Sequence, residues 1–287
     1  MRRLPGLVAR IRRQNVTPGL VGIYLRKLMH QAFATRPQEH GVLGILGCQR
    51  SGTSVMSRVF FRDREVRVFR EKSKLTGGEE GLRYLPFAEI NRTLATQRSP
   101  LIVFKMLVES QRALEFLETV QGARVLWLFR HYRDVVNSNL NRFGLRNGID
   151  DLRGMLSGNP GNWRSEACSD KTRHLVGDYF SESMRPQDAA ALFWYARNQL
   201  FFEQHLYREK RALLVEYERF VQNPAATMRS IYAFCGRAYP GDKLVAEVAS
   251  GSVSKGKHIE LSADIEALCI GLLDRLQQAA SAQVKRR

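Results

Sequence analysis

A short apolar run followed at once by a glycine-rich turn constrains the fold of this chain more than any other feature. The run GVLGIL (41–46) is typical of a buried strand, and GCQRSGTS (47–54) comes directly after it. Gly47 and Gly52 are separated by four residues, and a helix is predicted over 51–61. Such a turn points successive backbone N–H groups at one spot, where the helix dipole also favours an anion. The sequence therefore predicts an anion-binding loop.

This loop lacks the lysine that phosphoryl-transfer enzymes with a phosphate-binding loop require. Thr53 stands where the lysine would follow the second glycine, and the strands predicted over 101–105 and 125–130 do not end on an acidic residue that could hold Mg²⁺. Two predicted strands end instead on cations, Lys105 and Arg130. Since a cationic site can bind an anion without a metal, Arg50 is predicted to take over the role of the missing lysine. A nucleoside kinase that depends on ATP and Mg²⁺ is the alternative.

The segment QRSGTS (49–54) resembles the 5′-phosphosulfate-binding loop of sulfotransferases that use 3′-phosphoadenosine-5′-phosphosulfate (PAPS). The second signature of that family is an arginine that ends a strand and a serine eight residues later on the next helix. The segment FRHYRDVVNSNLNRFG supplies both, as Arg130 and Ser138. Arg142 follows four residues later, so it shares a helix face with Ser138. The resemblance implies that these three side chains bind the 3′-phosphate of the cofactor.

Two further segments resemble the same family. VEYERFVQNPAATMRSIYAFCG (215–236) is similar to its YEDLxxxP segment and the helix that follows, and SGSVSKGKH (250–258) lies where the family has a late loop that closes over the nucleotide. The resemblance implies PAPS as cofactor, no metal, and cofactor binding by Gln49, Arg50, Ser51, Gly52, Thr53, Ser54, Arg130, Ser138, Arg142, Tyr217, Ser252, Lys255 and Lys257. For Arg130, a simple ion pair with a carboxylate such as Asp134 is the alternative.

Sulfonate transfer also needs a base for the proton of the acceptor and cations on the charge that develops on the leaving group. Protein-tyrosine sulfotransferases place a glutamate base 21 residues after the loop arginine, and counting from Arg50 gives Glu71. The cytosolic small-molecule branch uses a histidine after the following strand, and VFKMLVES has none. The resemblance therefore implies Glu71 as base, with Arg50 and Lys105 stabilising the bridging oxygen. The alternative bases are Glu79 and Glu80.

Along the chain, apolar runs of strand type alternate with segments of helical type. Strands are predicted over 42–46, 66–69, 101–105, 125–130 and 212–216, and helices over 51–61, 84–96, 111–119, 133–141, 187–206, 224–235 and 263–280. This alternation predicts an α/β fold, a P-loop-like parallel sheet flanked by helices on both faces, and the resemblance implies the sulfotransferase fold. We expect a basic N-terminal helical segment over 1–40 and a single domain over 41–287, with an irregular insertion over 144–185.

The charge of the chain bears on its acceptor. The chain carries 45 basic and 28 acidic residues, a formal net charge of +17. The tyrosylprotein branch prefers tyrosines flanked by acidic residues, and a basic protein attracts such a peptide. Basic residues also crowd the sequence around Glu71: Arg62, Arg64, Arg67, Arg70 and Lys72. The resemblance thus implies an acidic tyrosine-containing peptide or protein as acceptor, and a carbohydrate or lipo-oligosaccharide is the alternative.

Other partners and the compartment follow from composition. The basic residues are scattered and lack interleaved aromatic residues, which argues against nucleic-acid binding. The four cysteines form no CxxC pair, no apolar run approaches about 18 residues, and the resemblance is to a compact bacterial type, so we expect a reducing, cytoplasmic location. The basic N-terminus is either a solvated helix or a peripheral contact with a membrane or a partner. A homodimer is left open.

Overall fold

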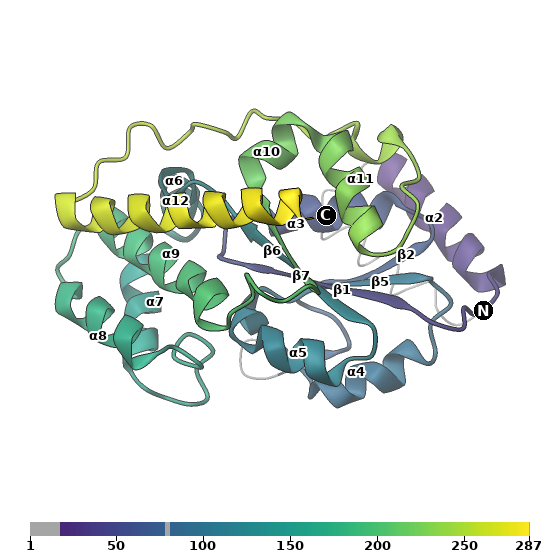
Figure 1. Cartoon of the computed structure of the whole chain (residues 1–287), viewed down its shortest axis with the longest axis horizontal. Coiled ribbons are helices and arrows are strands. Elements are labelled where there is room, and N and C mark those ends of the chain that lie inside the picture. Colours follow the sequence, from purple (N-terminus) through teal and green to yellow (C-terminus); the bar gives the residue numbers. More distant parts are fainter. Residues whose placement is uncertain (1–17, 78–80, 287) are drawn as a thin grey trace.

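A parallel sheet organises the computed structural model, which describes residues 18–77 and 81–286, and the side chains from residue 22 onward. The sheet contains β1 (Gly41–Gly47), β2 (Val66–Phe69), β5 (Leu101–Lys105), β6 (Ala123–Phe129) and β7 (Ala212–Glu216). Their order across the sheet is β2-β5-β1-β6-β7, and every neighbouring pair is parallel. Figure 1 shows β1 near the centre of this sheet and helices on either side of it. The predicted α/β fold with a parallel sheet is confirmed.

The remaining elements are mostly helices. They are α2 (Pro18–Phe33), α3 (Thr53–Arg62), α4 (Phe87–Leu94), α5 (Ala113–Thr119), α6 (Tyr132–Phe143), α7 (Asn147–Leu156), α8 (Asp170–Tyr179), α9 (Pro186–Glu203), α10 (Tyr217–Gln222), α11 (Pro224–Phe234) and α12 (Ala263–Lys285). Two 3₁₀ helices, η1 (Leu107–Arg112) and η2 (Asp242–Val245), and an antiparallel pair, β3 (Thr76–Gly77) with β4 (Arg83–Tyr84), complete the described elements. The predicted helix over 84–96 begins later than expected, since Tyr84 belongs to β4.

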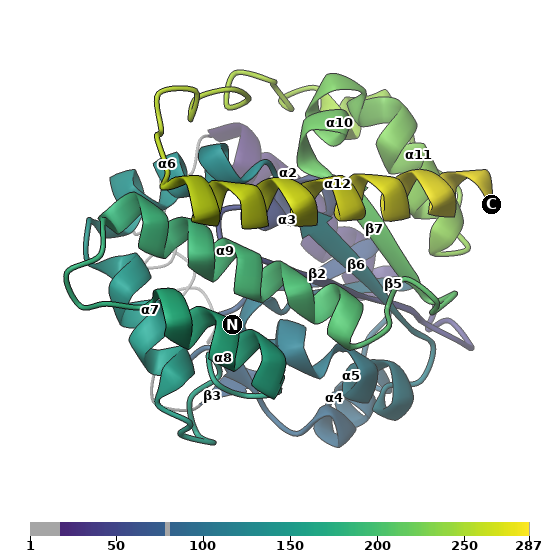
Figure 2. The same ribbon diagram turned by 60° about the vertical axis from the view of Figure 1, so that its left-hand side comes forward.

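Alternate residues of the strands supply two separate cores. Leu43 and Ile45 of β1 point to the face that α3, α10 and α11 cover. Val42 and Leu46 point to the opposite face, which packs against α5, α9 and α12. Figure 2 shows α12 running alongside α9 on that face. Burial on both faces explains why the strands are continuous apolar runs in the sequence rather than alternating patterns.

The insertion over 144–185 is only partly irregular, because two helices lie within it, and the prediction is wrong for those helices. It contains α7 and α8, which form a third apolar cluster with α9. Ile149, Leu152 and Met155 give α7 its buried stripe. A Cβ on Gly148 would lie 2.6 Å from the backbone nitrogen of Ala190, so this glycine allows α7 and α9 to approach closely. At least one glycine of this segment is thus a requirement of helix packing.

Helix α2 is held to the edge of the sheet by polar contacts. Lys27 Nζ donates to the carbonyl oxygens of Phe61 and Asp63, both at 2.9 Å. Gln31 Nε2 donates to the carbonyl oxygens of Arg64 and Val66, at 3.2 and 3.3 Å. Burial lowers the pKa of Lys27 to about 7, opposed by the Asp63 carboxylate and assisted by two nearby arginines. The described part of the 1–40 segment is therefore a helix packed against the end of α3 and the start of β2.

This lowered pKa predicts a pH dependence of stability. Between about pH 7 and the ordinary lysine pKa of 10.5, the unfolded chain binds the proton of Lys27 and the folded chain does not. The free energy of unfolding should therefore rise with pH across that window, because the unfolded state binds more protons there. Urea unfolding from pH 6 to 10 should show that Lys27→Met loses this rise. Lys243→Met, at an exposed lysine, should keep it. Equal pH profiles for both variants would contradict the assignment.

Candidate functional site

Each of the five parallel strands ends on, or is closely followed by, a candidate residue at the same edge of the sheet. The loop 47–54 follows β1 at the centre. Lys105 is the last residue of β5, and Arg130 is the first residue after β6, so the two cations flank the loop from the neighbouring strands. Glu71 comes two residues after β2, and Tyr217 directly after β7. Because the carboxyl ends of parallel strands share an edge, residues from distant parts of the sequence converge there.

The backbone of the loop 47–54 adopts left-handed conformations, which favour glycine over other residue types. Gly52 is left-handed (φ 92°), and a Cβ on it would lie 2.1 Å from the ring of Tyr217. Arg50 is also left-handed (φ 67°). Helix α3 begins at Thr53 without a side-chain cap, and the buried hydroxyl of Ser51 has no hydrogen-bond partner among the described residues. Uncapped N–H groups and a free buried hydroxyl at a helix start are the features of an anion site.

Beside the loop lies a hollow of about 340 Å³, which we call the arginine hollow. Its lining residues are Arg50, Arg130, Asp134, Asn137, Ser138, Asn141, Arg142, Ser252 and Lys255. The predicted group of Arg130, Ser138 and Arg142 thus comes together. Ser138 and Arg142 lie on α6, and Arg130 directly follows β6. Arg50 joins this group from the loop, since its Nε donates to Ser138 Oγ at 2.9 Å.

The charges in the arginine hollow repel one another. Burial lowers the pKa of Arg50, and the nearby guanidinium groups of Arg142 and Arg130 lower it further. A protonated guanidinium in such surroundings is stabilised by an anion. The hollow therefore has the charge and the hydrogen-bond donors that a phosphate group needs.

Asp134 is a residue of the candidate site that the sequence suggested only as an ion-pair partner. Its Oδ2 lies 3.4 Å from Arg130 Nη2, so the alternative ion pair does form. The same buried carboxylate also accepts hydrogen bonds from the backbone N–H groups of Ser254 (2.9 Å) and Gly256 (2.7 Å). A Cβ on Gly256 would lie 2.1 Å from the carbonyl oxygen of Arg133. Asp134 therefore fastens the late loop to the start of α6, next to Arg130.

The late loop completes one wall of the arginine hollow. The carbonyl oxygen of Ser252 accepts from Arg130 Nη2 at 2.5 Å, and Ser252 Oγ lies 2.7 Å from Tyr217 Oη. The guanidinium of Arg130 also lies over the Tyr217 ring, 4.8 Å from its centroid. Lys255 lines the hollow. Lys257 is exposed and lies outside the lining, as does Gln49.

The candidate base forms a compact cluster of its own. Lys105 Nζ donates to Glu71 Oε2 at 2.7 Å and to Ser54 Oγ at 3.0 Å. Ser54 is in the first turn of α3, so the cluster lies against the loop. Arg50 does not join it: its side chain is held by Ser138 in the arginine hollow, which differs from the expectation that Arg50 and Lys105 share one oxygen.

The alternative bases Glu79 and Glu80 lie outside the described residues. Of the five basic residues expected around Glu71, Arg62 pairs with Glu247, and Arg70 lies over the ring of Phe61.

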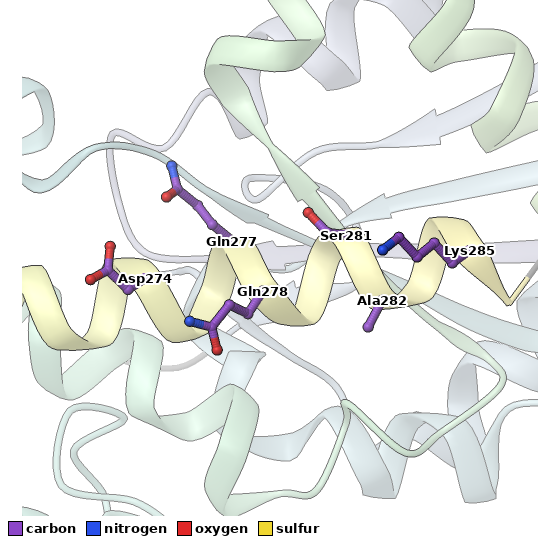
Figure 3. Close-up of a pocket in the computed structure, with 6 residues that line it drawn as sticks. All are labelled: Asp274, Gln277, Gln278, Ser281, Ala282 and Lys285. Carbon is purple, nitrogen blue, oxygen red and sulfur yellow. The ribbon is translucent and has the colours of Figure 1, made fainter.

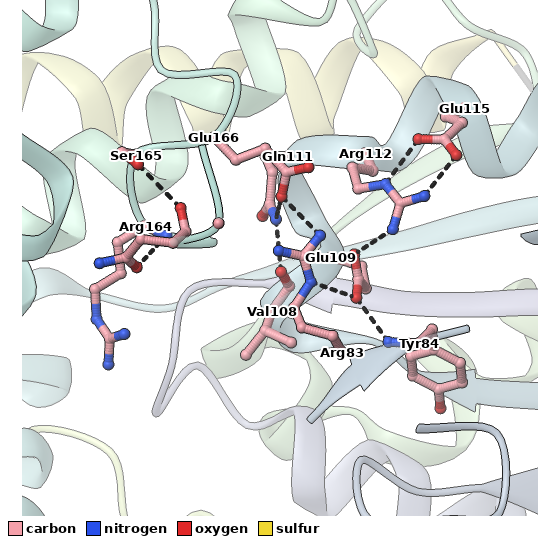
Figure 4. A network of polar contacts seen from close by, with 12 residues as sticks. Arg83, Tyr84, Val108, Glu109, Gln111, Arg112, Glu115, Arg164, Ser165 and Glu166 are labelled. Carbon is pink, nitrogen blue, oxygen red and sulfur yellow. Dashed lines mark hydrogen bonds and ion pairs between the residues drawn. The ribbon is translucent and has the colours of Figure 1, made fainter. Parts of the chain in front are cut away.

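A second polar network, which the sequence did not suggest, lies just beyond Lys105 (Figure 4). The buried carboxylate of Glu109 accepts from Arg83 Nε (2.9 Å), Arg112 Nη1 (3.0 Å) and the backbone N–H of Tyr84 (2.8 Å). Arg83 also pairs with Glu166 at 2.7 Å. The network ties β4 and the segment between α7 and α8 to η1, the turn that follows β5.

A further hollow, of about 460 Å³, runs along the surface of α12 (Figure 3). Its six lining residues are Asp274, Gln277, Gln278, Ser281, Ala282 and Lys285. Because all six come from one helix, no groups from separate elements converge there, and we assign it no role. Among residues 18–77 and 81–286 there is no cluster of three or more His, Cys, Asp or Glu side chains that would suit a metal ion. No described helix is long and apolar enough to span a membrane.

Comparison with known proteins relates the chain to sulfotransferases. Residues 163–241 match a family model described as "Sulfotransferase family". The matched segment includes Tyr217 but not the loop 47–54, Glu71 or Lys105. No curated protein matches the chain significantly by sequence.

Solved structures show the same relation at the level of the fold. The sulfotransferase domain of the Synechococcus PCC 7002 olefin synthase is 17% identical, with a TM-score of 0.51 over 85% of this chain and 98% of that one. The sulfotransferase domain from the curacin biosynthetic pathway is 14% identical, with a TM-score of 0.55 over 85% and 99%. A sulfotransferase from Alicyclobacillus acidocaldarius is 15% identical, with a TM-score of 0.50 over 88% and 100%. The chain therefore has the sulfotransferase fold.

Proposed function

We propose that this protein is a PAPS-dependent sulfotransferase that moves a sulfonate group to the hydroxyl of a peptide tyrosine flanked by acidic residues. One observation carries the proposal: an anion-binding loop lies between two distinct clusters. On one side is the arginine hollow. On the other is the ion pair of Lys105 and Glu71, a cation and a carboxylate within reach of the loop. The first suits a phosphate group, and the second suits proton and charge transfer at a reacting group.

The residues present fit PAPS on their own chemistry. The free Ser51 hydroxyl and the uncapped start of α3 supply donors for the 5′-phosphosulfate. Arg130, Ser138 and Arg142 supply donors for the 3′-phosphate, and Arg50 lies beside them in the arginine hollow. When bound, PAPS supplies the sulfonate that is transferred.

The Glu71 cluster supports the transfer step. With PAPS bound, the Glu71 carboxylate would take the proton of the acceptor hydroxyl. Lys105 Nζ would donate a hydrogen bond to the leaving phosphate and so stabilise its charge. The ion pair holds both groups beside Ser54 before substrate binds. Positioning and charge stabilisation then account for most of the rate enhancement.

The charge around Glu71 supports an acidic peptide as acceptor. Arg58, Arg70, Lys72 and Lys74 are exposed residues on α3 and around the end of β2. They give the approach to Glu71 a positive potential, in keeping with the net charge of +17. A peptide with carboxylates on both sides of its tyrosine would be attracted to this approach.

Replacing the base should remove turnover and spare cofactor binding. In Glu71→Gln we expect the turnover number to fall by about 10²–10⁴-fold, which is the usual contribution of a positioned general base. Calorimetric affinity for adenosine 3′,5′-bisphosphate should stay within a few-fold of wild type. Glu65→Gln, at an exposed glutamate, is the matched control and should turn over normally. Normal turnover in Glu71→Gln would exclude Glu71 as the base.

The arginine hollow should determine affinity for the 3′-phosphate. Arg142→Gln is expected to weaken binding of adenosine 3′,5′-bisphosphate by about 10–100-fold, because a charge-assisted hydrogen bond contributes about 1.5–3 kcal/mol. Adenosine 5′-phosphate lacks the 3′-phosphate, so its weaker binding should change little. The control is Arg146→Gln, four residues further along the chain and just before α7, where Arg146 pairs with Glu182 at the surface. Equal losses for both nucleotides would contradict a 3′-phosphate site.

The acceptor is tested by mass spectrometry without added metal. A peptide with tyrosine between Asp and Glu residues, incubated with the protein and PAPS, should gain one sulfonate. The same peptide with phenylalanine in place of tyrosine should not. Binding of adenosine 3′,5′-bisphosphate without any gain on the peptide would exclude this acceptor and point to a carbohydrate hydroxyl. Absence of both would contradict the sulfotransferase assignment itself.

A further inference from the structure

Helix α2 presents its polar side to the protein and its apolar side to solvent. Lys27 and Gln31, on the inner side, bind four backbone carbonyl oxygens at the end of α3 and the start of β2. Tyr24, also on this side, stacks on Phe61 with ring centroids 6.3 Å apart. An ordinary surface helix of a globular protein does the reverse and buries its apolar stripe.

The outward side of α2 carries an apolar stripe, which we call the outer stripe. It consists of Leu25, Leu28, Met29 and Phe33, with exposed fractions of 49%, 37%, 61% and 81%. The spacing i, i+3, i+4, i+8 places all four on one face of the helix. In Figure 1, α2 lies at the outer end of the sheet, beyond β2. The outer stripe is therefore an exposed apolar face on a helix at the edge of the sheet.

The charged residues of α2 itself are all basic. Residues 18–33 contain Arg26 and Lys27 and no Asp or Glu. Arg26 and Arg36 are exposed, and the exposed acidic residues Glu39 and Glu65 lie outside the helix. Arg64, whose carbonyl oxygen binds Gln31, is exposed as well. A partner for this face must supply apolar contact and negative charge together.

We propose that α2 docks the protein onto an anionic lipid surface, with the outer stripe inserted among the acyl chains and its arginines on the headgroups. An amphipathic helix with basic residues beside its apolar face has this mode of binding. A second copy of the chain fits less well, because α2 would then meet an identical helix that carries Arg26 and no carboxylate. Docking through α2 would place the lipid surface beside β2, and Glu71 follows β2 by two residues. The proposal does not depend on sulfonate transfer.

Vesicle sedimentation with the full chain tests the proposal. The wild-type protein should bind vesicles of phosphatidylglycerol and phosphatidylcholine, and should bind pure phosphatidylcholine much more weakly. The triple variant Leu25→Ser/Met29→Ser/Phe33→Ser should lose at least about tenfold in partition coefficient, since binding scales with buried apolar area. The matched control Leu145→Ser/Ile270→Ser/Val284→Ser removes equally exposed apolar side chains elsewhere and should bind like wild type.

A charge variant and a solution measurement separate the remaining outcomes. Arg26→Gln/Arg36→Gln should weaken binding and reduce its dependence on salt. Lipid binding that the apolar triple variant leaves unchanged would overturn the role of the outer stripe. A lipid-free dimer that this variant dissociates, without vesicle binding by wild type, would identify a second copy as the occupant instead. If the triple variant fails to fold by circular dichroism, Phe33→Ser alone gives the same comparison.

Discussion

The parallel arrangement of five strands is the constraint on which the rest of this structure depends. It brings all carboxyl ends to one edge, so that β1 places its loop between the ends of β5 and β6. Lys105 and Arg130 reach the loop from opposite sides only because those two strands are the neighbours of β1. Helix α9 reinforces the arrangement, since Trp194 Nε1 donates to the carbonyl oxygen of Arg130 at 3.0 Å. A cationic edge is therefore a consequence of topology.

Concentrating arginines at this edge is unfavourable until an anion arrives. The lowered pKa of Arg50 reflects this unfavourable free energy, because burial and two neighbouring guanidinium groups disfavour its charged form. Asp134 offsets part of this repulsion by pairing with Arg130, but its oxygens also accept hydrogen bonds from the backbone of the late loop. The carboxylate of Asp134 thus orders the arginine hollow, and the net charge of the hollow stays positive. Such an excess favours a ligand with more negative charge than a single carboxylate.

Sequence reasoning succeeded where local chemistry decides. The strand, the glycines and Arg50 within 41–54 specify the loop, and the apolar runs predict all five strands of the parallel sheet. It failed over 144–185, which contains α7 and α8 and where Gly148 allows close contact between α7 and α9. It also missed the Glu109 network, whose partners come from segments far apart in the chain. A glycine in a loop and a glycine that lets two helices approach look the same in the sequence, so only the neighbouring helix distinguishes the two cases.

The sequence by itself determined the parallel α/β architecture and the candidate anion-binding loop, and its resemblance to sulfotransferases supplied the candidates Glu71, Lys105, Arg130, Ser138 and Arg142. The architecture and the loop depend on periodicity, on glycine and on residue type, which are properties of short segments. Only the tertiary structure decided that Arg50 points to Ser138 and not to Lys105, and that Asp134 holds the late loop. It also decided that α2 turns its apolar side outward. These are choices of orientation, and orientation depends on contacts between segments that no single stretch of sequence contains.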